Sequence, residues 1–572
     1  MKKILLILTI FAGLAFVSCN KTLDEVPKDF YSPENSFVTK GQFESALADI
    51  YLRVRNNLYA INDNRDNYYL MGIDADLADG YGGAALGPIF SWNTLNADNG
   101  YASRLWSHAY RWIFEANTII DRADGPQAQW GSEADKNAIV AEAKFLRAFG
   151  YHFLANIYGG VPLALHETTT PKLDYVRASQ DSVYLQCKSD LEYAVQYMPK
   201  INTLAKGGRA PREAAYHLLS EVNICLKDYD GAIAAASAVI DGGNNNLMTT
   251  RFGKWTGFKF GGYTHNQPAV AWGDVYFDLF QDGNLNYKEG NREAIWNIEQ
   301  DPNIIGGDNT DVNVSGGFFV MERWWGGAAW ANNDKNNVLN WIKDTLGGRP
   351  AAGLVATKYA DSTIWNFKGD FNRDIRNSQY NIQREYYWTN PSSVFYGQKM
   401  TAANVSDPAL FIPRGSPSFK KVVSAVHYHK FTDAPGRGPD YHDNGRTYKD
   451  WYIMRLAETY LLRAEAKMDK GDLVGAAADI NAIRNRAQAT PVVAGDVNID
   501  LILDERAREL YQEEFRLSTL MRLGKLHEYI MKYNKYAIQQ GWKLDAHINK
   551  WPIPNSEIRA NTGAKLTQNP GY

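Results

Sequence analysis

The sequence of 572 residues is poor in cysteine and in catalytic signatures. It has three cysteines, with no CxxC pair and no spacing typical of a zinc site. It also lacks a Walker loop, a GxSxG motif and an HExxH motif. No short motif therefore marks the chain as a nucleotide-binding protein, a serine hydrolase or a zinc protease.

Neither charge sign dominates. The chain has 61 lysines and arginines against 64 aspartates and glutamates, a net charge of −3. Nucleic-acid binders that work through bulk charge carry a clear basic excess, so this class is excluded. Glycine, proline and apolar contents are ordinary, which excludes collagen-like, low-complexity and disordered classes. The length allows roughly three or four folding units, or one large one.

Long apolar runs are missing after the first residues. Lys2 and Lys3 precede the apolar stretch 4–17, and Ser18 and Cys19 follow it. This stretch is shorter than the roughly 20 residues that span a bilayer and is typical of an export signal. A cysteine at the cleavage point predicts a lipid anchor on Cys19, with plain secretion and a free thiol as the alternative.

Helical periodicity divides the rest of the chain. It predicts helices over 42–57, 101–123, 133–158, 179–197 and 211–226. The periodicity is lost from about 246 to 448 and returns from 449. We predict a mostly α fold with a helix-pair scaffold and a large irregular, Trp-rich insertion. Its parts are a lipoprotein signal peptide (1–18), an N-terminal helical part (19–245), the insertion (246–448), which is the candidate ligand-binding region, and a C-terminal helical part (449–572).

Two patterns refine the helical parts. Ser220 and Ala232, and likewise Ala464 and Ala476, stand twelve residues apart across an acidic turn. This spacing is typical of tetratricopeptide-like helix pairs, whose backbones approach closely at small residues. In helix 133–158, apolar residues at helical spacing predict one buried stripe with charged residues opposite.

The remaining cysteines, Cys187 and Cys225, lie in helix-like segments. Two buried free thiols are favoured over a single disulfide, because free cysteine packs well in cores.

Short motifs along most of the chain resemble those of one family. They are Leu23-Asp24, Ser32-Pro-Glu-Asn, Glu115-Ala-Asn117, Ala141-Glu-Ala-Lys-Phe-Leu-Arg-Ala, Tyr158-Gly-Gly-Val-Pro162, the run that begins at Arg455, Glu505-Arg506, Pro552-Ile-Pro and the ending Gln568-Asn-Pro-Gly-Tyr572. In this order the motifs resemble the SusD/RagB family of outer-membrane nutrient-binding lipoproteins.

The resemblance implies a biological setting. It implies a tetratricopeptide-like fold anchored through Cys19 at the surface of the outer membrane and docked on a TonB-dependent, SusC-like β-barrel transporter. Such a protein captures a glycan and delivers it to the transporter without catalysis and without a cofactor. A peptide-binding, RagB-type protein is the alternative within the family, and a glycoside hydrolase is the enzymatic one.

Tryptophan is concentrated in the insertion. Nine of the 16 tryptophans lie in residues 251–400, where an even spread predicts about four. Sugars have apolar faces and a hydroxyl rim, so their sites combine aromatic rings with polar side chains. Burial of some of these rings in a core is the alternative. The predicted ligand-binding residues of the insertion are Trp296, Arg323, Trp324, Trp325 and Trp330.

An earlier segment adds to this set. The run from Asp74 to Asn93 combines acidic residues with aromatic ones and precedes the helix 101–123. Tyr81, Trp92 and Asn93 are predicted to face the ligand. Asp74 and Asp76 are also explained by capping and turn chemistry.

Two candidate metal sites have less support in the sequence than the predicted ligand-binding residues. Asp282 to Glu293 has acids and amides at calcium-loop spacing, but Tyr287 stands at the sixth position, where the loop requires glycine. An Asn-rich turn is favoured. His427, His429 and His442 lack a partner at the right spacing for a metal.

Overall fold

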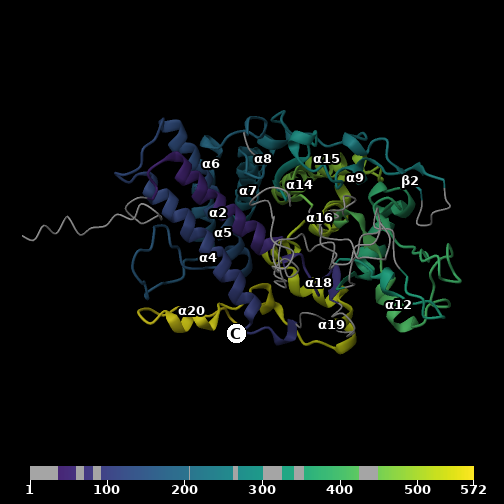
Figure 1. The fold of residues 1–572 in the computed structure, drawn as a ribbon. Helices are drawn as coiled ribbons and strands as arrows, with labels where there is room; N and C mark the ends of the chain where they lie inside the picture. Colours follow the sequence, from purple (N-terminus) through teal and green to yellow (C-terminus); the bar gives the residue numbers. More distant parts are fainter. Residues whose placement is uncertain are drawn as a thin grey trace, which may run out of the picture.

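The structure is a computed structural model that describes residues 36–59, 70–80, 92–204, 207–261, 268–300, 325–340, 353–423 and 449–572. Most of these residues are helical (Figure 1), so the predicted mostly α fold is confirmed. The helices are α2 (Lys40–Leu58), α4 (Gly100–Ala123), α5 (Glu133–Tyr158), α6 (Gln180–Tyr197), α7 (Arg212–Cys225), α8 (Tyr229–Ile240), α9 (Val275–Asp278), α12 (Pro408–Arg414), α14 (Leu456–Lys470), α15 (Leu473–Arg486), α16 (Ile499–Leu510), α17 (Arg516–Arg522), α18 (Leu526–Tyr533), α19 (Lys535–Gln540) and α20 (Asn555–Ala560).

The predicted helix boundaries follow from capping. Asn99 accepts hydrogen bonds from the backbone N–H groups of the first turn of α4, and Ser132 does the same for α5. Gly159, with φ of 76°, ends α5 where the sequence predicts a stop. The helices expected over 42–57, 101–123, 133–158, 179–197 and 211–226 are therefore confirmed.

Helix α5 differs from the prediction of one apolar stripe. Its second half is buried on all sides, because it lies among α2, α4, α6 and α17. Charged residues on the face expected in solvent are buried as ion pairs. Arg147 bonds Asp190 of α6 at 2.7 Å, and Glu142 pairs with Arg209. A polar residue on a central helix is therefore paired rather than hydrated.

The helix pairs form as predicted. In both α7–α8 and α14–α15, an aspartate caps the second helix: Asp228 accepts from the N–H of Gly231, and Asp472 from that of Gly475. A Cβ on either glycine would lie within 2.4 Å of the capping carboxylate, so these turns need glycine.

The small residues at the contacts are fully buried. Ser220 and Ala232 in the first pair, and Ala464 and Ala476 in the second, have 0% exposure. The Oγ of Ser220 also donates to the carbonyl of Ala232 at 3.0 Å. The predicted close approach of the two helices is confirmed in each pair.

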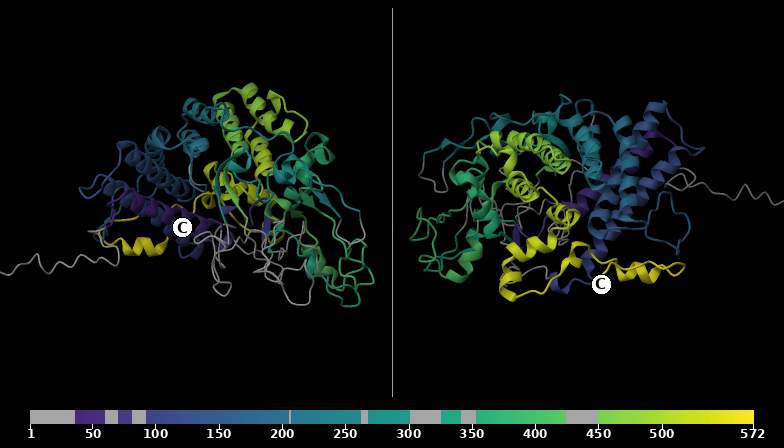
Figure 2. Two further views of the ribbon diagram at one scale, coloured as in Figure 1. Left: turned by 45° about the horizontal axis from the view of Figure 1, so that its top comes forward. Right: turned by 180° about the vertical axis from the view of Figure 1, so that it is seen from behind.

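The two helix pairs also contact each other. Helix α14 packs against both α7 and α8, although residues 241–455 separate α8 from α14 in the sequence. The stack from α4 to α8 thus continues directly into α14 and α15 (Figure 1 and Figure 2). The irregular region leaves the stack after α8 and returns to it at α14.

The described strands are short and form antiparallel pairs. They are β1 (Ala78–Gly80) with β5 (Leu354–Ala356), β2 (Lys259–Phe260) with β3 (Val270–Ala271), β4 (Ala294–Ile298) with β8 (Trp451–Arg455), and β6 (Ile382–Gln383) with β7 (Ser418–Phe419). The β4–β8 register shifts beside Trp296. Two-stranded pieces of this length are marginal alone, so other contacts must hold the insertion.

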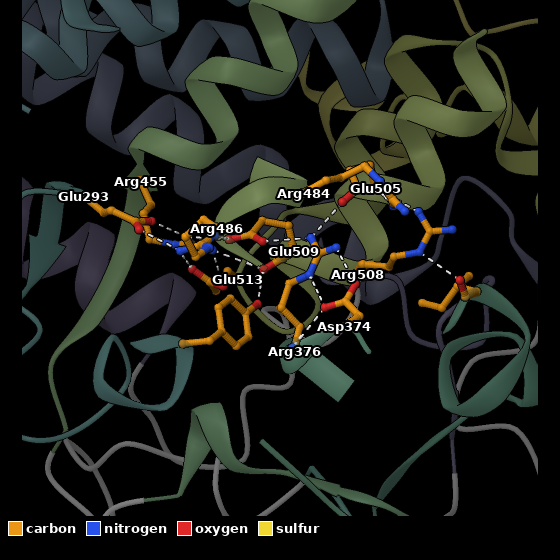
Figure 3. A network of polar contacts seen from close by, with 12 residues as sticks. Glu293, Asp374, Arg376, Arg455, Arg484, Arg486, Glu505, Arg508, Glu509 and Glu513 are labelled. Atoms are coloured by element: carbon orange, nitrogen blue, oxygen red, sulfur yellow. Dashed lines mark hydrogen bonds and ion pairs between the residues drawn. The ribbon is translucent and has the colours of Figure 1, made fainter. Parts of the chain in front are cut away.

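A buried network of ion pairs supplies such contacts (Figure 3). Glu509 on α16 bonds Arg455 at 2.8 Å, Arg376 at 3.0 Å and also Arg486. Glu505, one turn earlier, bonds Arg376 at 2.8 Å. Further members that close the network are Glu293, Asp374, Lys421, Arg484, Arg508 and Glu513.

The charges in this network compensate one another. Burial alone raises the pKa of a carboxyl group, but the surrounding guanidinium groups outweigh it. They hold the pKa of Glu505 at about 2 and that of Glu509 well below its usual range. Burial lowers the pKa of Lys421 to about 8, although Glu513 opposes this shift. Glu505 and Glu509 are therefore both ionised at neutral pH.

Two further findings concern the chain as a whole. Cys187 and Cys225 are free thiols, so the prediction of free thiols over a disulfide is confirmed, although only Cys187 is fully buried and Cys225 is partly buried. Burial raises the pKa of Cys225 to about 12. Among the described residues, every helix falls short of the length and apolar character needed to cross a membrane.

The network predicts a large difference between two glutamate variants. Glu509→Gln removes the negative charge that bonds three buried guanidinium groups. It should therefore cost about 3–5 kcal/mol of unfolding free energy. The control, Glu385→Gln, removes the exposed pair with Lys399 and should cost about 0–1 kcal/mol. Urea unfolding of both variants measures the difference. Equal midpoints would show that the network does not stabilise the fold.

Candidate functional site

The predicted ligand-binding residues are only partly covered by the structure. Tyr81, Arg323 and Trp324 lie outside the described residues, as do the lipidation candidate Cys19 and the three histidines His427, His429 and His442. Trp330 is in the short 3-10 helix Ala329–Ala331, but its side chain is outside the described part. Trp92, Asn93, Trp296 and Trp325 can be located.

Trp296 is part of the core, and its prediction as a ligand-facing residue is wrong. Its ring is 1% exposed and contacts Phe145 and Phe149 of α5 edge to face, at 5.3 and 5.2 Å between centroids. Its indole N–H donates to the carbonyl of Gly208 at 3.1 Å. Trp296 lies on β4, and its ring packs against α5, so it joins the insertion to the helical stack.

Trp92 and Trp325 are buried as well, at 2% and 1% exposure. The indole N–H of Trp92 donates to the backbone carbonyl of Asp74 at 2.6 Å. The ring of Trp325 meets that of Tyr511 edge to face at 5.4 Å. The structure therefore corrects their predicted role: both rings anchor the chain instead of facing a ligand. Asn93, next to Trp92, is exposed.

The anchors bring distant segments to one place, which we call the first root: Gly80, Trp325 and Leu354. Gly80 is paired with Leu354 in the β1–β5 ladder, and Trp325 forms a parallel bridge to the same Leu354. The N–H of Gly326 donates to the carbonyl of Leu354 at 3.0 Å. In the sequence, Tyr81 follows Gly80 directly and Trp324 precedes Trp325 directly, so the first root contains the described neighbour of each of these two predicted residues.

Acidic residues hold the first root in place through ion pairs and a backbone hydrogen bond. Nη2 and Nε of Arg516 both donate to Oδ2 of Asp76, at 2.6 and 3.0 Å, and Asp79 lies 3.3 Å from the ammonium of Lys535. Burial raises the pKa of both carboxyl groups, and the paired cations oppose this shift. Asp74 accepts the N–H of Gly80 at 2.7 Å, which is the predicted turn chemistry. The acids here hold the backbone.

A second cluster of contacts, which we call the second root, is formed by Gln300, Val423, Lys449 and Asp450. The N–H of Gln300 donates to a carboxylate oxygen of Asp450 at 2.8 Å. The ammonium of Lys449 donates to the carbonyl of Val423 at 2.9 Å. Gln300, Val423 and Lys449, the described residues that flank the stretches 301–324 and 424–448, are therefore close together.

Tyr511, the residue after α16, connects the two roots to the frame. It contacts the ring of Trp325 at 5.4 Å and that of Phe419 at 4.3 Å. Phe419 ends β7, shortly before Val423. A helix that carries three members of the ion network, Glu505, Arg508 and Glu509, thus supports both roots.

The calcium-like run Asp282 to Glu293 serves the fold. The amide of Asn284 donates to the carbonyls of Phe252 and Asp278, and that of Asn286 donates to Asp450. Glu293 at the twelfth position pairs with arginines of the ion network. The favoured Asn-rich turn is confirmed. The described residues contain no group of three side chains arranged to hold a metal ion.

Comparison with known proteins identifies the family. A model described as "SusD family" matches residues 283–572, and one described as "Starch-binding associating with outer membrane" matches residues 31–224. The chain belongs to the SusD family. The predicted family is therefore confirmed. Sequence similarity is also found to the starch-binding protein SusD of Bacteroides thetaiotaomicron, which is 39% identical over 80% of this chain and 76% of that protein.

Solved structures of SusD proteins share the fold. A SusD homolog from Bacteroides thetaiotaomicron has a TM-score of 0.68 at 17% identity, with 94% of this chain and 98% of that chain covered. Surface glycan-binding protein A of the same organism, solved in complex with laminarihexaose, has a TM-score of 0.62 at 17% identity, with coverage of 93% and 99%. At this identity the likeness concerns the fold alone.

Asp450 predicts a pH dependence at the second root. Burial, helped by the nearby charge of Glu299, raises its pKa to about 7. The folded state therefore holds this proton more tightly than the unfolded chain, and stability from this group is lost as pH rises from about 4 to 7. Asp450→Asn removes the titration, so its stability relative to wild type should rise over this window, by about 1–4 kcal/mol.

The measurement is urea unfolding of both proteins at several pH values. Asp174→Asn is the control, since its exposed pair with Lys172 lowers the pKa of the carboxyl group and the effect should be small and of opposite sign. A constant difference between Asp450→Asn and wild type across pH would refute the raised pKa.

Proposed function

We propose that this SusD-family protein is a surface-exposed glycan-binding lipoprotein that captures oligo- or polysaccharide without catalysis. The observation that carries the proposal is the first root, which brings together Gly80 and Trp325, the sequence neighbours of the predicted ligand-binding residues Tyr81 and Trp324. Exposed Asn93 follows the buried anchor Trp92. The names of similar proteins support the ligand class: one is a starch-binding protein and another was solved with laminarihexaose.

The remaining parts of the proposal follow the family. Cys19 would carry the lipid that anchors the protein in the outer membrane, and a TonB-dependent, SusC-like β-barrel would receive the glycan. We further propose residues 246–448, together with the segment around Tyr81 and Asn93, as the recognition region between the helical parts 19–245 and 449–572. Arg323, Trp324 and Trp330 are its ligand-binding residues within the insertion.

The central carboxylates of the ion network do not have the properties of a hydrolytic pair. A glycoside hydrolase needs an acid whose pKa is raised, set opposite a second carboxylate with space for substrate or water. In the network, Glu505 and Glu509 have lowered pKa values and their oxygens bond arginines. Their charge is already used to hold the core.

A glycan panel tests the function. Native affinity electrophoresis with soluble polysaccharides should show retardation of the protein, and product analysis should show no release of shorter sugars. Dissociation constants from micromolar to millimolar, roughly −8 to −4 kcal/mol, are expected for each site. Release of products would support a hydrolase instead. Binding of peptides with no glycan retarded would support the RagB-type alternative.

Tryptophan variants test the residues. Trp324→Ala and Trp330→Ala should weaken glycan retention several-fold, because an aromatic platform contributes on the order of 1 kcal/mol, with little change in melting temperature. Trp296→Ala should instead lower the unfolding free energy by about 3–5 kcal/mol, since a buried ring is lost. If Trp324→Ala and Trp330→Ala both keep wild-type affinity, these two residues are not the platform.

A further inference from the structure

A second candidate site lies at the other end of the molecule. A cavity of about 230 Å³ opens between α4, the stretch after α5 and the C-terminal segment. We call it the α4 groove and define it by Trp106, Ser107, Tyr110, Tyr175, Glu557 and Leu566. Helix α20, which carries Glu557, lies at the end of the molecule opposite α12 of the insertion (Figure 1 and Figure 2).

The walls of the groove are held rigidly. The hydroxyl of Tyr110 donates to the carbonyl of Pro162 at 2.7 Å. Asn561 ties the stretch after α5 to the C-terminal segment, because it accepts the N–H of Tyr175 at 2.7 Å and donates to the carbonyl of Tyr175 at 2.8 Å. A cavity whose walls are fixed in advance loses little conformational entropy when a ligand binds.

The groove is lined by aromatic rings. Trp106 and Tyr110 lie one turn apart on α4, with 4.9 Å between ring centroids. Trp106 is only 4% exposed and also packs on Tyr158, so the partly exposed rings of the groove are those of Tyr110 and of Tyr175 from the stretch after α5. Leu566, on the C-terminal segment, adds apolar surface. Such walls suit a ligand with flat apolar faces.

Polar groups of the same residues are unused. In the described part of the chain, the indole N–H of Trp106 and the hydroxyl of Tyr175 have no hydrogen-bond partner. The carboxylate of Glu557 forms no ion pair there and receives only the side-chain hydroxyl of Ser556, at 3.4 Å. The groove thus offers donors and an acceptor together.

This combination discriminates between ligand classes. An ammonium ion suits aromatic rings and a carboxylate, but it has no lone pair to accept the indole N–H. The ammonium of Lys172 also stands 5.4 Å from the centre of the Tyr175 ring, so this ring already has a cation beside it. A sugar offers apolar faces, donors and acceptors at once.

We propose that the α4 groove is a second carbohydrate-binding site. It rests on the proposed function for the class of ligand only, and none of its residues belongs to the two roots. The cavity is smaller than the roughly 300–1,000 Å³ of pockets for drug-sized molecules. It therefore takes one or two sugar rings, such as the end of a chain.

A blocking variant tests the proposal. Ser107 is exposed and its hydroxyl bonds only the carbonyl of Ser103 in its own helix, so Ser107→Tyr should fill the groove without disturbing the core. Ser45→Tyr is the matched control, since Ser45 makes the same bond to Gly41 on the exposed face of α2. Glu557→Gln removes the charged acceptor and should weaken binding about tenfold.

Hydrogen–deuterium exchange is measured on residues 555–566 with maltose, laminaribiose, cellobiose, xylobiose or choline. At least one disaccharide should slow exchange in wild type and Ser45→Tyr but not in Ser107→Tyr. Protection by choline alone, or by no disaccharide, overturns the proposal. Glycan retention that persists in Ser107→Tyr but is lost in Trp324→Ala would leave the proposed function intact. Disaccharide protection of 555–566 without retention by the loops would support the groove alone.

Discussion

The buried ion network is the constraint on which the rest of the structure depends. Glu505 and Glu509 of α16 face arginines from β8, α15 and the segment around Arg376. A buried charge without its partner is costly, so each member fixes the position of the others. The network therefore joins the irregular insertion to the helical stack, which its short strand pairs could not do alone.

Helix α16, which carries Glu505 and Glu509, also holds the two roots in place. Helix α16 ends beside Tyr511, whose ring contacts both Trp325 and Phe419. The first and second roots are thus supported by a helix whose own position is set by ion pairs. Binding residues on loops are effective when a rigid scaffold positions the ends of those loops. The division between a fixed frame and the segments proposed for recognition is a consequence of where the charges are buried.

Local sequence determined the helices, their caps and the helix pairs, and these were predictable because their signals lie within a few residues. The aromatic residues of the insertion were not. Trp296 is buried by Phe145 and Phe149 of α5, which are distant in sequence, and no periodicity marks its inner face. The burial of charged residues on α5 and α16 could not be predicted for the same reason. A glutamate on a helix suggests a solvated face until its partner, such as Arg376 for Glu509, is known.

A binding surface at the roots and a groove near α20 would cooperate on a polymer. Once one part of a long glycan is held, a second part binds at an effective concentration set by the length between them. A polymer that reaches both ends of the molecule is then retained more strongly than a short fragment that reaches one. A protein that must capture long chains and let short ones go gains this selectivity from two weak sites on one rigid frame, and a single tight site would lose it.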